Sequence, residues 1–147
     1  MKDRMIRAIV LFVLAFIALL IFIGLYIDET HRVQETYRIQ YYTYLTKTNE
    51  SIDSYLDAEG DLPLRYRRIL ADMTSAQNFG FLLDEISEEH KRNLTELQAC
   101  LMKYPEQMQE KEKLEAMRKA VTDISQNLDK GYDEAAELVD SIDKKGY

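Results

Sequence analysis

The sequence has few prolines, glycines and cysteines, the residues that interrupt helices or crosslink a chain. Only two prolines and five glycines occur among 147 residues, below their usual shares of about 7% for glycine and about 5% for proline. Because these two residues mark most turns, their scarcity favours long helices with few connections. The single cysteine, Cys100, has no partner within the chain, so packing and not an internal disulfide must hold the fold together.

Positive charge is in the minority. The formal net charge is −7, although residues 1–7 hold three cations against one carboxylate, so the acidic excess lies in the rest of the chain. Affinity for nucleic acid comes mainly from neutralising phosphates, and an acidic domain does this poorly. Anionic lipid headgroups would repel it for the same reason. We therefore expect no nucleic-acid partner.

Charge is absent altogether from residues 8–27, which read AIVLFVLAFIALLIFIGLYI. A helix of that length spans about 30 Å, the hydrocarbon thickness of a bilayer. A cleaved signal peptide usually has an apolar region of about 7–15 residues followed by a small-x-small pair, and residues 24–28 offer no such pair. The sequence therefore predicts an uncleaved transmembrane helix at residues 8–27 that binds membrane lipid.

Lysine and arginine flank this segment unequally. Lys2, Arg4 and Arg7 precede it, whereas Arg32 and Arg38 follow it among several carboxylates. The side richer in lysine and arginine usually faces the cytoplasm. We expect a single-pass membrane protein with residues 1–7 in the cytoplasm and residues 28–147 as an extracytoplasmic domain.

The rest of the chain has apolar residues at steps of three and four, the spacing of amphipathic helices. Turn residues occur at two places, Gly60-Asp61-Leu62-Pro63 and Tyr104-Pro105. These turns predict helices at about residues 28–59, 62–103 and 105–145. Gly80 is a weak point inside the second helix, where glycine costs about 1 kcal/mol relative to alanine.

The third predicted helix has the most regular apolar seam, which resembles that of a coiled coil. The seam consists of Leu114, Met117, Val121, Ile124, Leu128, Gly131, Ala135, Leu138 and Ile142. Short connections between helices imply antiparallel neighbours. The predicted fold class is all-α, a single N-terminal transmembrane helix continuing into an elongated antiparallel three-helix, coiled-coil-like bundle. A fourth helix could come from a second copy or from another protein.

The residues that often carry chemistry do not gather into a site. Asp28 and His31 are spaced to share a metal ion, but a metal site in a helical bundle needs several more ligands. His90 falls on an apolar seam, where a core or boundary histidine is expected. We predict no catalytic residue, no metal, no cofactor and no enzymatic activity.

Cys100 has no histidine or aspartate placed to activate it as a nucleophile. It is either a small buried residue or the site of an intermolecular disulfide with a second copy. The tripeptides beginning at Asn49 and Asn93 match the glycosylation pattern. Both fall inside predicted helices, and we interpret them as chance matches.

Two features form a candidate surface for a partner or ligand. Arg65, Arg67 and Arg68 make a basic patch near the start of the second predicted helix, where cations are slightly unfavourable. They could bind an acidic ligand or partner, or pair across the turn with Asp57, Glu59 and Asp61. Aromatic residues supply the second feature, since the neighbouring tyrosines of the first helix cannot all point one way. These aromatic candidates are Tyr41, Tyr42, Phe79 and Phe81.

These patterns favour a membrane-anchored accessory protein that binds another protein, or a second copy of itself, through its helical bundle. The layout of residues 1–145 is also similar to the four-helix-bundle sensor domain of chemotaxis receptors, which implies a sensory or ligand-binding module. The sequence shows neither the second membrane helix nor the output region of those receptors. A spanin-like lysis protein, which needs an outer-membrane partner, is a third alternative.

Overall fold

The computed structural model describes residues 2–57, 60–126 and 129–144. These residues form helices and contain no strand, so the predicted all-α class is confirmed. The helices are α1 (Lys2–Leu56), α2 (Leu62–Phe81), α3 (Glu88–Lys103), α4 (Pro105–Met108), α5 (Lys111–Ser125) and α6 (Asp129–Asp140). The chain divides into two compact units, residues 1–36 and residues 37–147.

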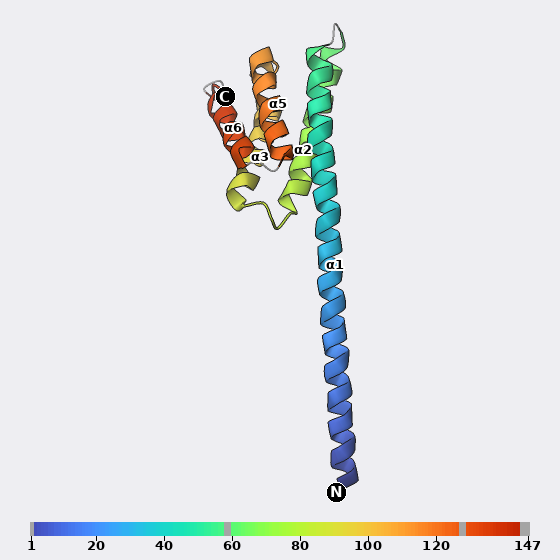
Figure 1. Ribbon diagram of the computed structural model, residues 1–147. Coiled ribbons are helices and arrows are strands. Elements are labelled where there is room, and N and C mark those ends of the chain that lie inside the picture. The colour runs from blue at the N-terminus through green and yellow to red at the C-terminus, as the bar shows by residue number, and fades with distance from the viewer. Residues whose placement is uncertain (1, 58–59, 127–128, 145–147) are drawn as a thin grey trace. The chain divides into compact units, whose positions relative to one another are not determined.

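The first unit is the amino-terminal part of α1 (Figure 1). Every side chain from Arg4 to Arg32 is exposed. Among the described residues, α1 is the one helix that is long and apolar enough to cross a membrane, and none of its apolar window is buried in the protein. The helix continues without a break to Leu56, in agreement with the lack of proline and glycine between residues 28 and 57.

In the second unit, the carboxyl-terminal part of α1 runs antiparallel to α2 (Figure 1). Tyr41 packs beneath Gly80, and the Ser51 hydroxyl donates to the Asp72 carboxylate over 2.6 Å. Residue numbers therefore increase along α1 in the direction in which they decrease along α2, as in an antiparallel pair. The turn lies where the sequence predicts it, with Asp61 at the N-cap of α2 and Pro63 in the first turn.

Asp61 adopts the left-handed conformation with φ of 56°, and its side chain makes no capping hydrogen bond. Aspartate is one of the few residues other than glycine that adopt this conformation readily. The predicted end of the preceding helix at Glu59 lies outside the described residues. As described, α1 ends at Leu56.

The prediction of one helix over residues 62–103 is wrong. It is two helices, because α2 ends at Phe81 and α3 begins at Glu88. Ser87 caps α3 by accepting a hydrogen bond from the His90 amide, and Glu88 and Glu89 in the first turn favour the positive end of the helix dipole. This start signal separates the two helices, while Gly80 stays inside α2 against Tyr41.

Helix α3 then returns along α2. Thr74 accepts a hydrogen bond from Gln98, and Gln77 donates to Thr95, so the two helices are antiparallel. The Tyr66 hydroxyl donates to the Leu101 carbonyl oxygen over 2.7 Å within the core. The short connection at residues 82–87 thus joins two antiparallel neighbours, as expected.

The prediction of one helix over residues 105–145 is also wrong. Helices α4, α5 and α6 occupy this range, and its predicted end at residue 145 lies outside the described residues. The backbone of Glu110 is extended between α4 and α5. The seam position Leu128, between α5 and α6, also lies outside the described residues.

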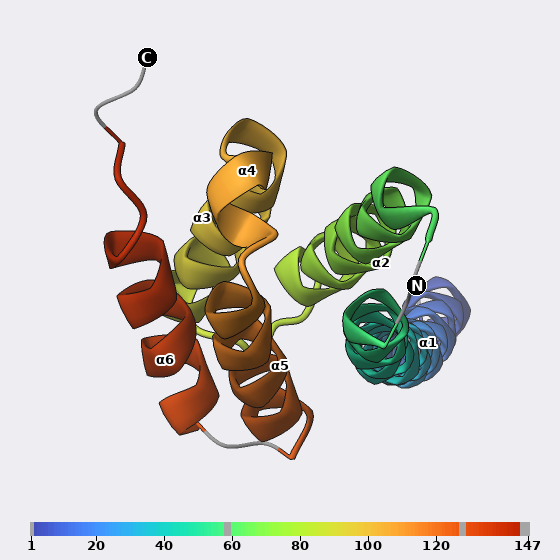
Figure 2. The ribbon, with the colours of Figure 1, turned by 90° about the horizontal axis from the view of Figure 1, so that it is seen from above.

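Helices α5 and α6 lie side by side (Figure 2). Lys119 donates a hydrogen bond to the Glu134 carboxylate and Lys113 donates to the Ser141 hydroxyl, so the two helices are antiparallel. The long seam predicted for one helix therefore folds back and packs its two halves against each other. Gly131 permits this close approach, because a β-carbon there would stand 2.6 Å from the Ala120 carbonyl oxygen.

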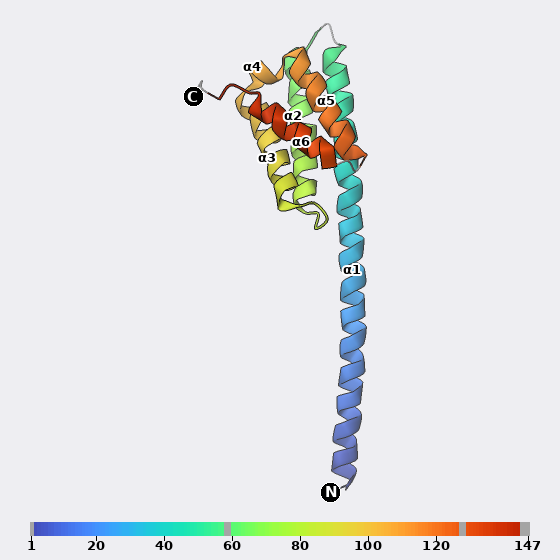
Figure 3. The ribbon, with the colours of Figure 1, turned by 60° about the vertical axis from the view of Figure 1, so that its left-hand side comes forward.

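The core of the second unit draws on all six helices, with α4 contributing Met108, and α6 packs on α3 as well as on α5 (Figure 3). Its largest fully buried side chains are Tyr41, Leu45, Ile52, Ile69, Met73, Leu83, Leu94, Leu97, Leu101, Met108, Leu114 and Met117. The second and third predicted helices are thus each divided into shorter helices, which pack with the carboxyl-terminal part of α1 around a common core.

Candidate interaction surface

The three arginines at the start of α2 have different environments. Arg65 is half-buried and donates to the carbonyl oxygens of Gly60 and Ser54 and to the Ser54 hydroxyl. It therefore ties the carboxyl-terminal turn of α1 to α2 through neutral acceptors, and not through the expected carboxylates of Asp57 or Asp61. The other expected partner, Glu59, lies outside the described residues.

Arg67 and Arg68 are exposed. Within the described residues, no ion pair joins either of them to a carboxylate. With Asp61, Leu64, Arg65 and Ala71 they line an open cavity of about 490 Å³. Three arginines against one aspartate give this cavity a local excess of positive charge on an acidic chain.

Tyr41 does not belong to an accessible surface, so its assignment there is corrected. It is 1% exposed, and its hydroxyl lies 3.0 Å from the Tyr132 hydroxyl. Burial, followed by the proximity of Tyr132, raises the pKa of Tyr41 far above its ordinary value. Burial also raises the pKa of Tyr132 to about 12. Both hydroxyls are therefore protonated at neutral pH and pair with each other inside the core.

Tyr42 is half-buried and lies at the rim of that core. Its ring is 5.3 Å from the ring of Tyr41, and burial, with a smaller contribution from Glu85, raises its pKa. Tyr42, Glu85, His90, Asp129 and Tyr132 line much of a cavity of about 200 Å³. The His90 ring stacks on Tyr132 with ring centroids 4.0 Å apart, which agrees with the expected boundary histidine.

Phe79 and Phe81 do not act together. Phe79 is half-buried and stacks on Tyr44, with 5.7 Å between ring centroids. Phe81 is 59% exposed, and the Lys91 ammonium lies 5.7 Å from its ring centroid. Only Phe81 of the two therefore presents most of its ring to solvent.

Cys100 is 4% exposed, and burial raises the pKa of its thiol. A disulfide needs a sulfur that another molecule can reach, and nucleophilic exchange needs a thiolate. Burial limits access to the Cys100 sulfur, and the raised pKa disfavours its thiolate. Of the two alternatives predicted for Cys100, the burial favours a small buried residue over an intermolecular disulfide.

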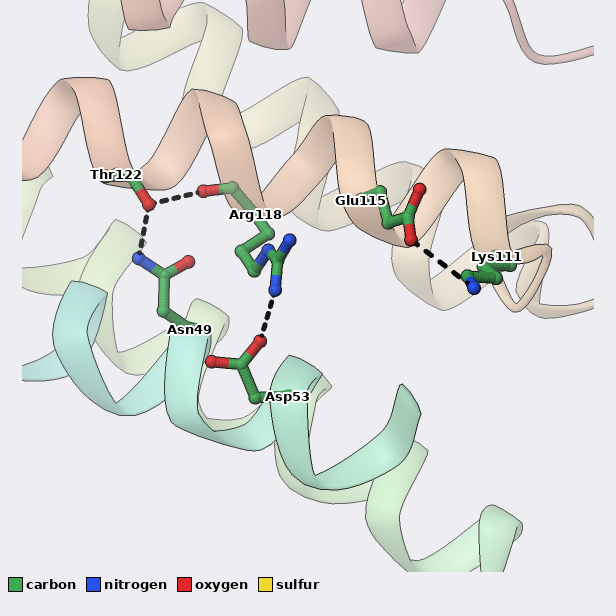
Figure 4. Close-up of polar contacts among 6 residues, drawn as sticks. All are labelled: Asn49, Asp53, Lys111, Glu115, Arg118 and Thr122. Carbon is green, nitrogen blue, oxygen red and sulfur yellow. Dashed lines mark hydrogen bonds and ion pairs between the residues drawn. The ribbon is translucent and has the colours of Figure 1, made fainter. Parts of the chain in front are cut away.

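A polar contact between α1 and α5 was not anticipated from the sequence (Figure 4). The Asn49 amide nitrogen donates to the Thr122 hydroxyl over 3.1 Å, and Arg118 donates to Asp53 over 2.7 Å. Asp53 raises the pKa of Arg118 by hydrogen bonding. Opposite charges at positions 53 and 118 carry no signal of their pairing, because 65 residues separate them in the chain.

The two glycosylation tripeptides have their asparagine nitrogens already engaged. Asn49 donates to Thr122, and Asn93, which is 9% exposed, donates to the Tyr132 carbonyl oxygen. His31 is exposed on the first unit. Throughout the described ranges, no group of three or more His, Cys, Asp or Glu side chains could hold a metal ion.

Comparison of the chain with protein-family models, with curated proteins and with solved structures gives no match. Of the candidate surface residues predicted from the sequence, Arg67, Arg68 and Phe81 are exposed, whereas Arg65, Tyr42 and Phe79 are half-buried.

Proposed function

We propose that this chain is a non-catalytic accessory protein that residues 8–27 anchor in a membrane and that binds another protein through residues 37–147. The observation that carries the anchor is the apolar window of α1, of which no residue is buried within the protein. Leaving so large an apolar surface in water costs about 25 cal/mol per Å². Lipid covers a helix that is apolar on all sides.

The orientation follows from charge. Residues 1–7 carry three cations against one carboxylate, whereas the residues directly after the span mix both signs. The positive-inside rule then places residues 1–7 in the cytoplasm and the helical unit on the other side of the membrane.

Binding to a protein is supported by the kinds of side chain that the second unit exposes. Phe81, Met102 and Leu64 are each more than half exposed, and Arg67 and Arg68 lie on the same unit without a carboxylate partner among the described residues. Phenylalanine, methionine and arginine are enriched in protein interfaces relative to the rest of the surface.

The experiment is lysine crosslinking in the native membrane, followed by mass spectrometry, with carbonate extraction and protease treatment of intact cells in parallel. We expect the chain to stay in the carbonate-washed membrane, external protease to degrade residues 37–147, and crosslinks to join this unit to a different polypeptide. A freely soluble chain that lacks residues 1–27 would contradict the anchor. Crosslinks between copies alone would favour the sensory module instead.

A further inference from the structure

We propose that Leu64, Arg67 and Arg68, here named the α2 patch, bind an acidic, amphipathic segment of a partner protein. The inference rests on the proposed function, because it names the surface and the chemistry of the partner that the function requires. The patch occupies the first turns of α2 beside the tie that Arg65 makes to α1.

Hydrogen bonds hold Arg65, a neighbour of the α2 patch, in place. The Arg65 Nε donates to the Gly60 carbonyl oxygen and one terminal nitrogen donates to Ser54, so Arg65 holds the turn beside the α2 patch. Arg67 and Arg68 are exposed, and Leu64 is 67% exposed. All three line the same open cavity of about 490 Å³.

Arg67 and Arg68 are two exposed arginines that line one cavity, and neither has a carboxylate partner among the described residues. The chain has 26 acidic residues against 19 lysines and arginines, so carboxylates are abundant. Several other cations of the second unit do pair, as Arg38 does with Glu85 and Arg118 with Asp53. Among the described residues neither Arg67 nor Arg68 forms such an ion pair, so both guanidinium groups are available to an external carboxylate.

The chemistry of the patch favours a protein segment. Arginine binds carboxylates in a two-pronged geometry, and Leu64 adds an apolar contact that a purely polar anion cannot use. A broad anionic lipid surface would also meet the acidic remainder of the chain, which repels it. Screening over about 8 Å at physiological salt reduces the repulsion that a short acidic segment bound at the α2 patch meets from the more distant carboxylates of the chain.

The test uses the full chain in zwitterionic phosphatidylcholine nanodiscs and a short fluorescent helical peptide whose two faces carry glutamate and leucine. One matched peptide has glutamine in place of glutamate, and another has serine in place of leucine. Fluorescence anisotropy measures binding to the wild type, to the double variant R67E/R68E, to L64S and to R92E. Arg92 is an exposed arginine on α3, so R92E controls for added negative charge.

We expect R67E/R68E to weaken binding of the glutamate–leucine peptide by at least about tenfold, because repulsion replaces two charge pairs. The L64S variant and both matched peptides should also bind more weakly, while R92E stays within about twofold of the wild type. Unchanged circular dichroism shows that each variant is folded. Equal binding by R67E/R68E and the wild type, or equal binding of the glutamine peptide, would overturn the proposal.

Two further outcomes would assign the patch to another anion. If phosphatidylglycerol vesicles or inorganic polyphosphate bind through Arg67 and Arg68 and the peptide does not, the proposal fails. Repeating the membrane crosslinking with R67E/R68E separates the two claims. Crosslinks that persist at full yield overturn this surface and leave the proposed function standing, whereas peptide binding without any cellular crosslink contradicts the proposed function alone.

Discussion

Gly131 packs so closely on Ile124 that a β-carbon at position 131 would stand 2.6 Å from the Ile124 amide nitrogen. No side chain fits there unless α5 and α6 move apart. We predict that Gly131→Ala lowers the free energy of unfolding by about 2 kcal/mol, because overpacking outweighs the gain of about 1 kcal/mol in helix propensity. Urea unfolding followed by tyrosine fluorescence measures this change.

Gly60→Ala is the matched control, since no atom lies within 4 Å of a β-carbon built at Gly60. Its unfolding free energy should stay within about 0.5 kcal/mol of the wild type. Equal stability of Gly131→Ala and Gly60→Ala would contradict the close contact of α5 with α6.

The paired hydroxyls of Tyr41 and Tyr132 are expected to be energetically coupled. Either single change, Tyr41→Phe or Tyr132→Phe, leaves one buried hydroxyl without its partner and should cost about 1–2 kcal/mol. The double variant removes both hydroxyls, so its loss should be smaller than the sum of the single losses. A double-mutant cycle in urea measures the coupling, and strictly additive losses would show that the two hydroxyls do not interact.

Alkaline pH should destabilise the fold through the same two residues. Burial raises both pKa values above the ordinary 10.0, to about 12 for Tyr132. Above pH 10 the unfolded chain loses these protons while the folded chain keeps them. Stability is therefore fully present below pH 10 and falls as the pH rises towards 12, by about 1.4 kcal/mol per pH unit for each tyrosine.

Urea unfolding at several pH values checks this slope, and Tyr132→Phe should make it shallower between pH 10 and 12. An unchanged slope in that variant would assign the alkaline loss of stability to other groups.

Cys100 should resist modification in the folded chain. The thiol is buried and its pKa is raised, so a maleimide reagent at neutral pH should label it at least about tenfold more slowly than in urea. Mass spectrometry over time gives both rates. A disulfide-linked dimer on a non-reducing gel of the native membrane would contradict this burial.

The all-helical class and the turns at Asp61–Pro63 and at Tyr104–Pro105 could be predicted because proline, glycine and apolar spacing report on local backbone preference. The break before α3 also has a local signal that the prediction overlooked. Ser87 followed by Glu88 and Glu89 is the pattern of a capped helix start.

The break between α5 and α6 lacks the two strongest turn signals, because residues 126–128 contain neither glycine nor proline. Helix α6 packs back on α5, with Gly131 against Ala120. The seam was correct as a set of buried positions for Leu114, Met117 and Ile124, but spacing alone cannot tell a straight seam from a folded one.

For the candidate surface, the sequence identified the basic patch but not which of its arginines is hydrogen-bonded within the fold. Which arginine ties the turn depends on where the carbonyl oxygens of Ser54 and Gly60 lie. Periodicity did carry a signal for Tyr41, which is spaced at steps of three and four from the buried Thr48 and Ile52, whereas Tyr42 lies 100° away from that face.

Tyr132 joins three helices at one residue, since its hydroxyl meets Tyr41, its carbonyl oxygen accepts from Asn93 and its ring stacks on His90. A carboxyl-terminal helix is ordinarily the first part of a chain to open. Here the opening of α6 would leave the Tyr41 hydroxyl on α1 and the Asn93 side chain on α3 without their hydrogen-bond partner. The amides around Tyr132 should therefore exchange with deuterium as slowly as those of the central helices, and α6 should open only when the second unit opens as a whole.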